Sequence, residues 1–293
     1  MDGGPDPGAI FLFGVLSVLV FIIGYKRGFF ALNFSLLFWP VSIRWFHVLF
    51  VFLIYFGISL FIAPTIGAIL RTYFFPGISP YELLGYISWL NWINSLLVLS
   101  LIVLFVRSLS PSIWAKIWRR VESSAYSEDV TFAVFAWLIS FPPVLFLTQL
   151  LDWLVARLFH VQELPEQLAV HFLKMTFDSP FYASLSIFTI ILLAPLIEEI
   201  LFRGFLQTFI RQHLGSRQAI GITSLLFALF HYAPEQGLGN IPIVGSLLVL
   251  ALFLGFVYEK RGSLLAPITL HACFNSISVL NLYFLGGFPQ SPI

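Results

Sequence analysis

The chain has 293 residues, of which 59% are hydrophobic and only 10% are charged, and its mean hydropathy is +0.95. Soluble domains are about one quarter charged, so this composition excludes an ordinary soluble domain and predicts an integral membrane protein. The net charge of +1 gives no indication of a nucleic-acid partner, and the single cysteine, Cys273, excludes a disulfide bond within the chain.

Long apolar runs without the two-residue alternation of β-strands predict an all-α fold, a polytopic transmembrane helical bundle of about eight spans. The flank before the first run, MDGGPDP, is acidic, which favours a retained span over a cleaved signal peptide. Asp152 is expected to mark the end of the fourth span. The predicted spans cover residues 9–25, 46–64, 84–106, 131–151, 181–201, 217–232, 241–258 and 264–285.

The distribution of lysine and arginine predicts the orientation of this bundle. Of the 15 basic residues, only Arg71, Arg157 and Lys174 fall in one set of alternate connections, and the other 12 fall in the opposite set. Because basic loops stay on the cytoplasmic side, eight spans with both ends of the chain outside are expected. The protein is therefore expected to be multi-pass, and to lie in the plasma (inner) membrane if its source is bacterial.

Two carboxylates and an arginine interrupt the fifth apolar run, in the stretch APLIEEILFRG. A charged side chain at mid-membrane costs about 2.5–3.5 kcal/mol even on generous scales, so such residues usually mark function. Glu199 and Arg203 are four residues apart and share a helix face, so they can neutralise each other. Glu198 points about 100° away from Glu199, and Pro195 is expected to kink the helix beside it. Glu198 is therefore predicted to face a cavity.

Three more polar residues lie in later apolar runs, His231 in FALFH and His271 with Asn275 in HACFN. A carboxylate beside a histidine can hold a water and take its proton, and a histidine with an amide can stabilise the oxyanion of a tetrahedral intermediate. This set suits hydrolysis. Glu198, His231 and His271 could instead bind a divalent metal such as zinc, which would acidify the water. These residues by themselves do not separate the two chemistries.

Each of these features also has a structural explanation. Glu199 with Arg203 can hold helices together, His231 can be an interfacial residue, and His271 with Asn275 can hydrogen-bond neighbouring helices. A transporter that uses the carboxylate and the histidines as a relay is a further alternative, although the two halves of the chain show no inverted repeat. The occurrence of all three features in one segment favours a catalytic site.

The stretches EEILFRG, FALFH and HACFN follow the patterns EExxxR, FxxxH and HxxxN. Together with GSLLAPI before the last of them, they resemble the CPBP family of intramembrane proteases, which includes the type II CAAX prenyl endopeptidases and bacterial Abi-type proteins. The similarity covers about residues 181–285. It divides the chain into N-terminal transmembrane helices without a recognisable motif, 1–130, and a protease core, 131–293, with motifs at 198–203, 227–231 and 271–275.

The resemblance implies a role for each matched position. Glu198 corresponds to the glutamate that activates water, and His231 to its partner in holding that water. His271 and Asn275 correspond to the pair that stabilises the oxyanion. The matched supporting residues are Glu199, Arg203 and Phe227.

The resemblance further implies an intramembrane endopeptidase of the glutamic or metallo type, acting at the C-terminus of a prenylated protein or on another membrane-associated protein. The expected partners are a protein or peptide substrate, lipidated substrates included, and the lipid bilayer. No obligatory cofactor is expected, and zinc or another divalent metal is the alternative. A non-proteolytic scaffold or bacteriocin-immunity protein of the same fold is the alternative function. HExxH, GxSG and GxGD, which mark other intramembrane proteases, do not occur in the sequence.

The predicted boundaries contain one conflict. They put Glu198 late in the fifth span and His231 late in the sixth, at opposite faces of the membrane, whereas residues that act together must share a depth. Because EILFRGFLQTFI stays apolar on most faces, we expect the fifth span to continue to about Phe209. Glu198 would then lie at mid-membrane, with Arg203 buried against Glu199.

Overall fold

The computed structural model describes residues 7–31, 42–109, 111–119, 125–161 and 164–285. Over these residues the protein is helical, and the only β-type pairing is an isolated bridge between Arg119 and Ser263. The all-α bundle predicted from the apolar runs is therefore confirmed.

Within the described ranges, seven helices are long and apolar enough to cross a membrane, and α11 is a shorter apolar helix of 15 residues. Several of the long helices change from α to π geometry without ending. The elements are α1 Pro7–Lys26, α2 Trp45–Phe56, η2 Gly57–Ile62, α3 Ala63–Phe74, α4 Pro80–Leu109, α5 Pro111–Trp118, α6 Tyr126–Phe159, α7 Leu168–Thr176, α8 Pro180–Phe188, η3 Thr189–Leu193, α9 Ala194–Glu199, η4 Ile200–Gln207, α10 Thr208–Leu214, α11 Ser216–Phe230, η5 Pro234–Gly239, α12 Asn240–Arg261 and α13 Leu265–Leu285.

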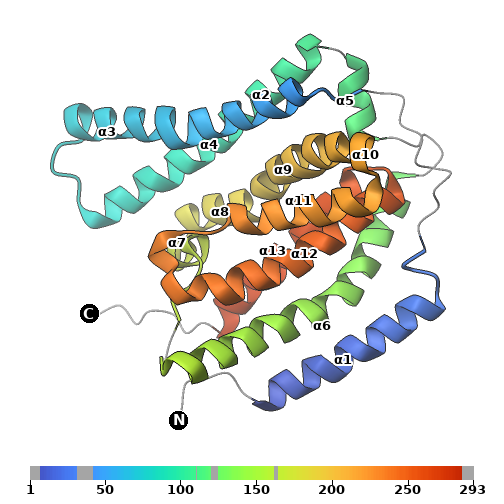
Figure 1. The fold of residues 1–293 in the computed structure, drawn as a ribbon. Coiled ribbons are helices and arrows are strands. Elements are labelled where there is room, and N and C mark those ends of the chain that lie inside the picture. Colours follow the sequence, from blue (N-terminus) through green and yellow to red (C-terminus); the bar gives the residue numbers. More distant parts are fainter. Residues whose placement is uncertain (1–6, 32–41, 110, 120–124, 162–163, 286–293) are drawn as a thin grey trace.

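The helices form three layers, which Figure 1 shows from the side. One outer layer holds α2, α3 and α4, the other holds α1 against α6, and α8 to α13 lie between them. Within the membrane-spanning windows, 44% of the residues are buried in Pro180–Leu214 and in Pro234–Arg261, but only 11% are buried in Pro7–Lys26. The three motifs therefore occupy the centre of the bundle, shielded from lipid on two sides.

The central helix that carries the first motif runs without a break from Pro180 to Leu214. The π-helical turns η3 and η4 flank the short α-helix α9, which holds APLIEE. The N–H of Ala194 bonds to the carbonyl of Thr189 in the i→i−5 pattern. The next N–H in this pattern would belong to Pro195, which has none. The carbonyl of Ile190 is thus left to another donor, and Pro195 changes the helix by widening it rather than by ending it.

The helix α5 lies across η4 at close range. A Cβ atom at Gly204 would lie 2.7 Å from Cγ2 of Ile117, so a larger residue there would push α5 away. Ile117 has no solvent exposure. Gly204 therefore permits the contact that covers one end of the central helix.

The connection from α11 to α12 is irregular but well bonded. α11 ends at Phe230, and His231 is the residue that follows. The side chain of Asn240 accepts a hydrogen bond from Ala233 N at 3.1 Å and donates to the carbonyls of Ala233, at 2.7 Å, and Gly237, at 3.1 Å. One side chain thus satisfies much of the backbone that follows His231.

Several spans are longer than the sequence predicted. The fifth continues to Leu214, past the expected Phe209, which confirms that Glu198 lies near the middle of its helix. The fourth runs from Tyr126 to Phe159 instead of 131–151. The helix thus continues seven residues past Asp152, the residue expected to end the span. Asp152 lies inside the helix and lines a cavity.

A buried carboxylate joins the start of α6 to the end of α12. Asp129 has no solvent exposure, and its Oδ1 accepts a hydrogen bond from Nε of Arg261 at 2.8 Å. Its Oδ2 lies 3.7 Å from Nη2 of Arg119. Glu128 reaches Arg261 too, at 3.4 Å, but its side chain is 61% exposed.

Replacing Asp129 by Asn is expected to lower the free energy of unfolding by about 3 kcal/mol, because two arginines lose their buried counter-charge. The matched control, Glu128→Gln, removes an exposed partner of the same Arg261 and should cost less than about 1 kcal/mol. Unfolding of the detergent-solubilised protein measures both. Equal losses in the two variants would contradict this assignment.

Candidate active site

The first motif places an ion pair in the centre of the bundle. Glu199 and Arg203 both have no solvent exposure, and Nη1 of Arg203 donates to Oε1 of Glu199 at 2.8 Å. The four-residue spacing puts both side chains on one face even though η4 is π-helical. The two charges therefore neutralise each other, as the sequence predicted.

Two further contacts hold the guanidinium of Arg203. Its Nη2 donates to the carbonyl of Ala251 on α12 at 3.2 Å. Its Cζ lies 4.5 Å from the ring centroid of Phe227, a cation–π distance. Phe227 is fully buried, and its ring also lies 4.8 Å from that of His231 and 5.9 Å from that of His271. The aromatic residue of the second motif thus separates the arginine from both histidines.

Glu199 has a second partner that the spacing of the motif could not indicate. Its Oε1 lies 3.0 Å from Nδ1 of His271, across 72 positions of the sequence. A carboxylate only accepts hydrogen bonds, so Nδ1 of His271 carries the proton and Nε2 is left for the site. Glu199 therefore orients a histidine as well as neutralising Arg203.

Glu198 points toward both histidines. Its Oε2 lies 3.8 Å from Nε2 of His231 and 3.9 Å from Nε2 of His271. The Nδ1 of His231 donates to the carbonyl of Phe227 at 2.9 Å, so its Nε2 is also the nitrogen left for the site. Oε2 of Glu198 is buried and has no hydrogen-bond partner among the described residues. Two imidazole nitrogens thus converge on one carboxylate oxygen that is left to bind something else.

Asn275 lies one turn after His271 on α13. Its Nδ2 donates at 2.8 Å to the carbonyl of Ile190, the group that Pro195 leaves without a donor. An asparagine amide has two N–H donors, so one remains available. The structure places Asn275 beside the other three residues but gives it no contact with Glu198 among the interactions of the described residues.

The three polar motifs thus meet as the sequence predicted, with Glu198, His231 and His271 in one cluster. Sequence reasoning missed the second role of Glu199 and the carbonyls of Ala251 and Ile190. Pro195 was the one available signal, because a proline inside a helix leaves a carbonyl that needs another donor. The contact of Glu199 with His271 and that of Arg203 with the carbonyl of Ala251 join distant segments, and no local sequence pattern predicts them.

The geometry of this cluster differs from that of a zinc site. Among the described residues, no group of three or more His, Cys, Asp and Glu side chains is placed to hold a metal ion. Ligands about 2.0–2.1 Å from one tetrahedral zinc lie roughly 3.3 Å from each other, whereas the nitrogens of His231 and His271 lie 3.8 and 3.9 Å from Glu198 Oε2.

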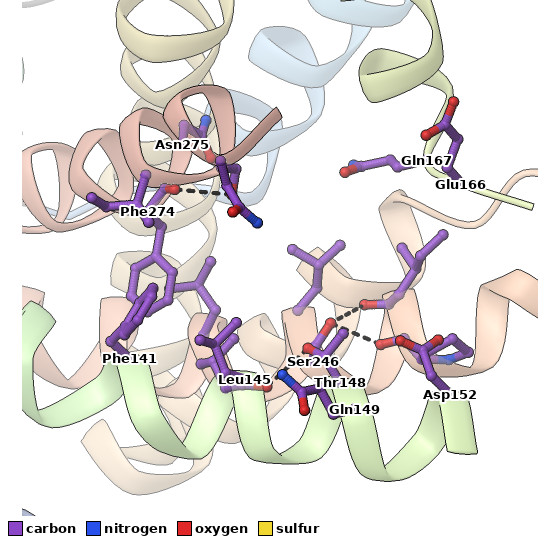
Figure 2. A pocket seen from close by; sticks show the side chains of 18 of the residues that line it. Phe141, Leu145, Thr148, Gln149, Asp152, Glu166, Gln167, Ser246, Phe274 and Asn275 are labelled. Carbon is purple, nitrogen blue, oxygen red and sulfur yellow. Dashed lines mark hydrogen bonds between the residues drawn. The ribbon is translucent and has the colours of Figure 1, made fainter. Parts of the chain in front are cut away.

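A cavity of about 980 Å³ lies between α6, α12 and α13 and includes Asn275 in its lining. Figure 2 shows Asn275 and Phe274 at one end and Asp152 at the other, with Thr148 and Gln149 between them. The rings of Phe141 and Phe274 are 5.8 Å apart at the inner end. Glu198 does not line this cavity, so the cavity approaches the cluster from the side of Asn275.

The chain was compared with known proteins. Residues 180–277 match a family model described as type II CAAX prenyl endopeptidase Rce1-like. The match begins at the first residue of α8 and ends in α13 just past Asn275, so it includes all three motifs and no part of α1 to α7. No curated protein and no solved structure matches the chain. Residues 180–277 are therefore similar to the Rce1-like family of type II CAAX prenyl endopeptidases, in agreement with the CPBP resemblance of the three motifs.

Proposed function

We propose that this chain hydrolyses a peptide bond of a membrane-associated protein, a lipidated one included, by means of a water that Glu198 activates. The observation that carries the proposal is the approach of His231 Nε2 and His271 Nε2 to Oε2 of Glu198, at 3.8 and 3.9 Å. A water oxygen at an ordinary hydrogen-bond distance of about 2.8 Å from Glu198 Oε2 and from Nε2 of His231 bridges these two atoms.

In the first step, this water gives one hydrogen bond to Glu198 and the other to Nε2 of His231. Its oxygen attacks the carbonyl carbon of the substrate while Glu198 takes the proton. A new C–O bond forms, and the electron pair of the C=O bond moves onto the carbonyl oxygen. Glu199 neutralises Arg203, so Glu198 is the carboxylate left to act as the base.

In the second step, the negative oxygen needs hydrogen-bond donors. The N–H of Asn275 that Ile190 does not use is one donor. His271 lies one turn earlier on the same face of α13 and donates when its Nε2 is protonated. The intermediate then collapses, the C–N bond breaks, and the leaving amine takes the proton that Glu198 received. The water has been added across the peptide bond, and the residues return to their first state.

Replacing Glu198 by Gln is expected to lower the cleavage rate of a membrane-anchored substrate by about 100- to 10 000-fold, the usual contribution of a general base. The matched control is Glu235→Gln, an exposed acid four residues after His231, which should cleave at the normal rate. Mass spectrometry of the products from purified protein in lipid nanodiscs measures both.

Normal cleavage by Glu198→Gln would refute the proposed base. A variant that cleaves nothing yet fully replaces the natural gene in cells would instead favour the alternative function, a scaffold or an immunity-type protein.

Removing metals is expected to leave the activity unchanged, because the proposed mechanism gives water activation to Glu198 and not to a zinc ion. The protein would be purified with chelator, its metal content measured by mass spectrometry, and its cleavage rate compared before and after. Loss of activity that zinc alone restores would contradict the proposal.

A double variant can separate the structural role of the Glu199–Arg203 ion pair from the catalytic role of Glu198. Glu199→Gln and Arg203→Met are each expected to lower the free energy of unfolding by about 3–5 kcal/mol, since each leaves one buried charge without its partner. The combined variant removes both charges and should regain most of this stability. It should still cleave slowly, because His271 has lost its carboxylate. Recovery of full activity together with stability would show that Glu199 serves the ion pair alone.

A further inference from the structure

The large cavity of Figure 2 contains a carboxylate that the proposed reaction does not use. Asp152 lies on α6, seven residues before the end of this apolar helix, and lines the cavity. Its side chain has no hydrogen bond or ion pair to the described part of the chain. An ionised carboxylate inside a membrane protein is costly without a partner. Asp152 is therefore placed to receive a positive charge from a ligand.

The other acidic residue of the cavity is already neutralised. Glu166 is bonded to Nζ of Lys174 at 2.5 Å and lies 3.2 Å from Nδ1 of His171. Among the described residues, no lysine or arginine lines the cavity. Asp152 is thus the acid that remains for a cation, and no positive side chain within the cavity competes for it.

A second acceptor stands beside this carboxylate. Gln149 precedes Asp152 by three residues and shares its helix face. Its Oε1 is buried and has no hydrogen-bond partner among the described residues. A lysine ammonium has three N–H donors and an arginine guanidinium has five. Either group could bond Asp152 and Gln149 together.

The end of the cavity that Asn275 lines indicates which ligand carries this positive charge. Asn275, which the proposed mechanism places against the substrate oxyanion, belongs to the lining. A ligand that fills the cavity from Asp152 to Asn275 therefore reaches the reacting carbonyl. We infer that the cavity binds the peptide substrate itself, and that Asp152 with Gln149 recognises a lysine or arginine side chain of that substrate. This inference rests on the proposed function and adds a substrate class to it.

The structure also gives the distance between the lysine or arginine of the substrate and the peptide bond that is cleaved. Phe141 lies beside Phe274 at the end of the cavity near Asn275, and their ring centroids are 5.8 Å apart. Phe141 and Asp152 are eleven positions apart on α6, or about 16 Å at 1.5 Å per residue. An extended peptide advances about 3.3–3.6 Å per residue. The basic residue should therefore lie about five residues from the scissile bond.

The test uses a series of peptides that carry one lysine in an otherwise apolar sequence, with the lysine moved by one position in each. In lipid nanodiscs, the cleaved bond is expected to move with the lysine and to stay about five residues from it. Asp152→Asn should raise KM for these peptides by about tenfold or more with little change in kcat. Asp152→Lys should prefer the series that carries glutamate instead. The matched control, Asp178→Asn, removes an exposed acid outside the cavity and should cleave normally.

Binding to the inactive Glu198→Gln protein separates this inference from the proposed function. Loss of lysine-peptide binding when Asp152→Asn is added would support the inference even if the wild type cleaves nothing. Cleavage at a position that does not follow the lysine, or equal KM values for lysine and glutamine peptides, would overturn the inference and leave the protease intact. Binding of an ammonium lipid in place of the peptide would also overturn it.

Discussion

The buried pair of Glu199 and Arg203 is the interaction around which the middle layer is arranged. Two charges without solvent exposure are tolerable only when each is neutralised and further contacts hold it in place. Arg203 therefore requires a carbonyl from α12 and the face of Phe227 from α11. Glu199 requires a donor from α13, and His271 supplies it. Satisfying one ion pair thus fixes four helices relative to each other.

The sequence predicted the parts of this arrangement that are local. The pairing of Glu199 with Arg203 follows from helix geometry, and the length of the central helix follows from the apolar faces of EILFRGFLQTFI. The end of α6 could not be predicted in this way, because the helix continues seven residues past Asp152, the charge expected to end the fourth span. A charge does not end a helix, and Asp152 lines a cavity along one side of α6. Contacts such as that between Glu199 and His271 join positions that no spacing rule connects.

Pro195 leaves a backbone carbonyl without a donor, and a residue far along the chain supplies one. Its missing N–H leaves the carbonyl of Ile190 without a helical partner, and the amide of Asn275 takes that place. The same bond fixes the asparagine at the inner end of the cavity. Asn275 therefore both supplies the hydrogen-bond donor that the helix lacks at Ile190 and forms part of the site. A loss of activity on changing it would not by itself distinguish the two roles.

The shortness of α11 has a consequence for the surrounding bilayer. Its 15 residues extend about 22 Å, while the hydrocarbon layer is about 30 Å thick. α11 is thus several ångströms shorter than this layer, and His231 directly follows its end. The irregular backbone beyond it is supported at that depth by Asn240, as non-helical chain within a membrane requires. Thinning of the bilayer is one way in which a membrane accommodates a helix shorter than its hydrocarbon layer. For a hydrolase that takes its water from outside the hydrocarbon, thinning beside α11 would shorten the route to His231.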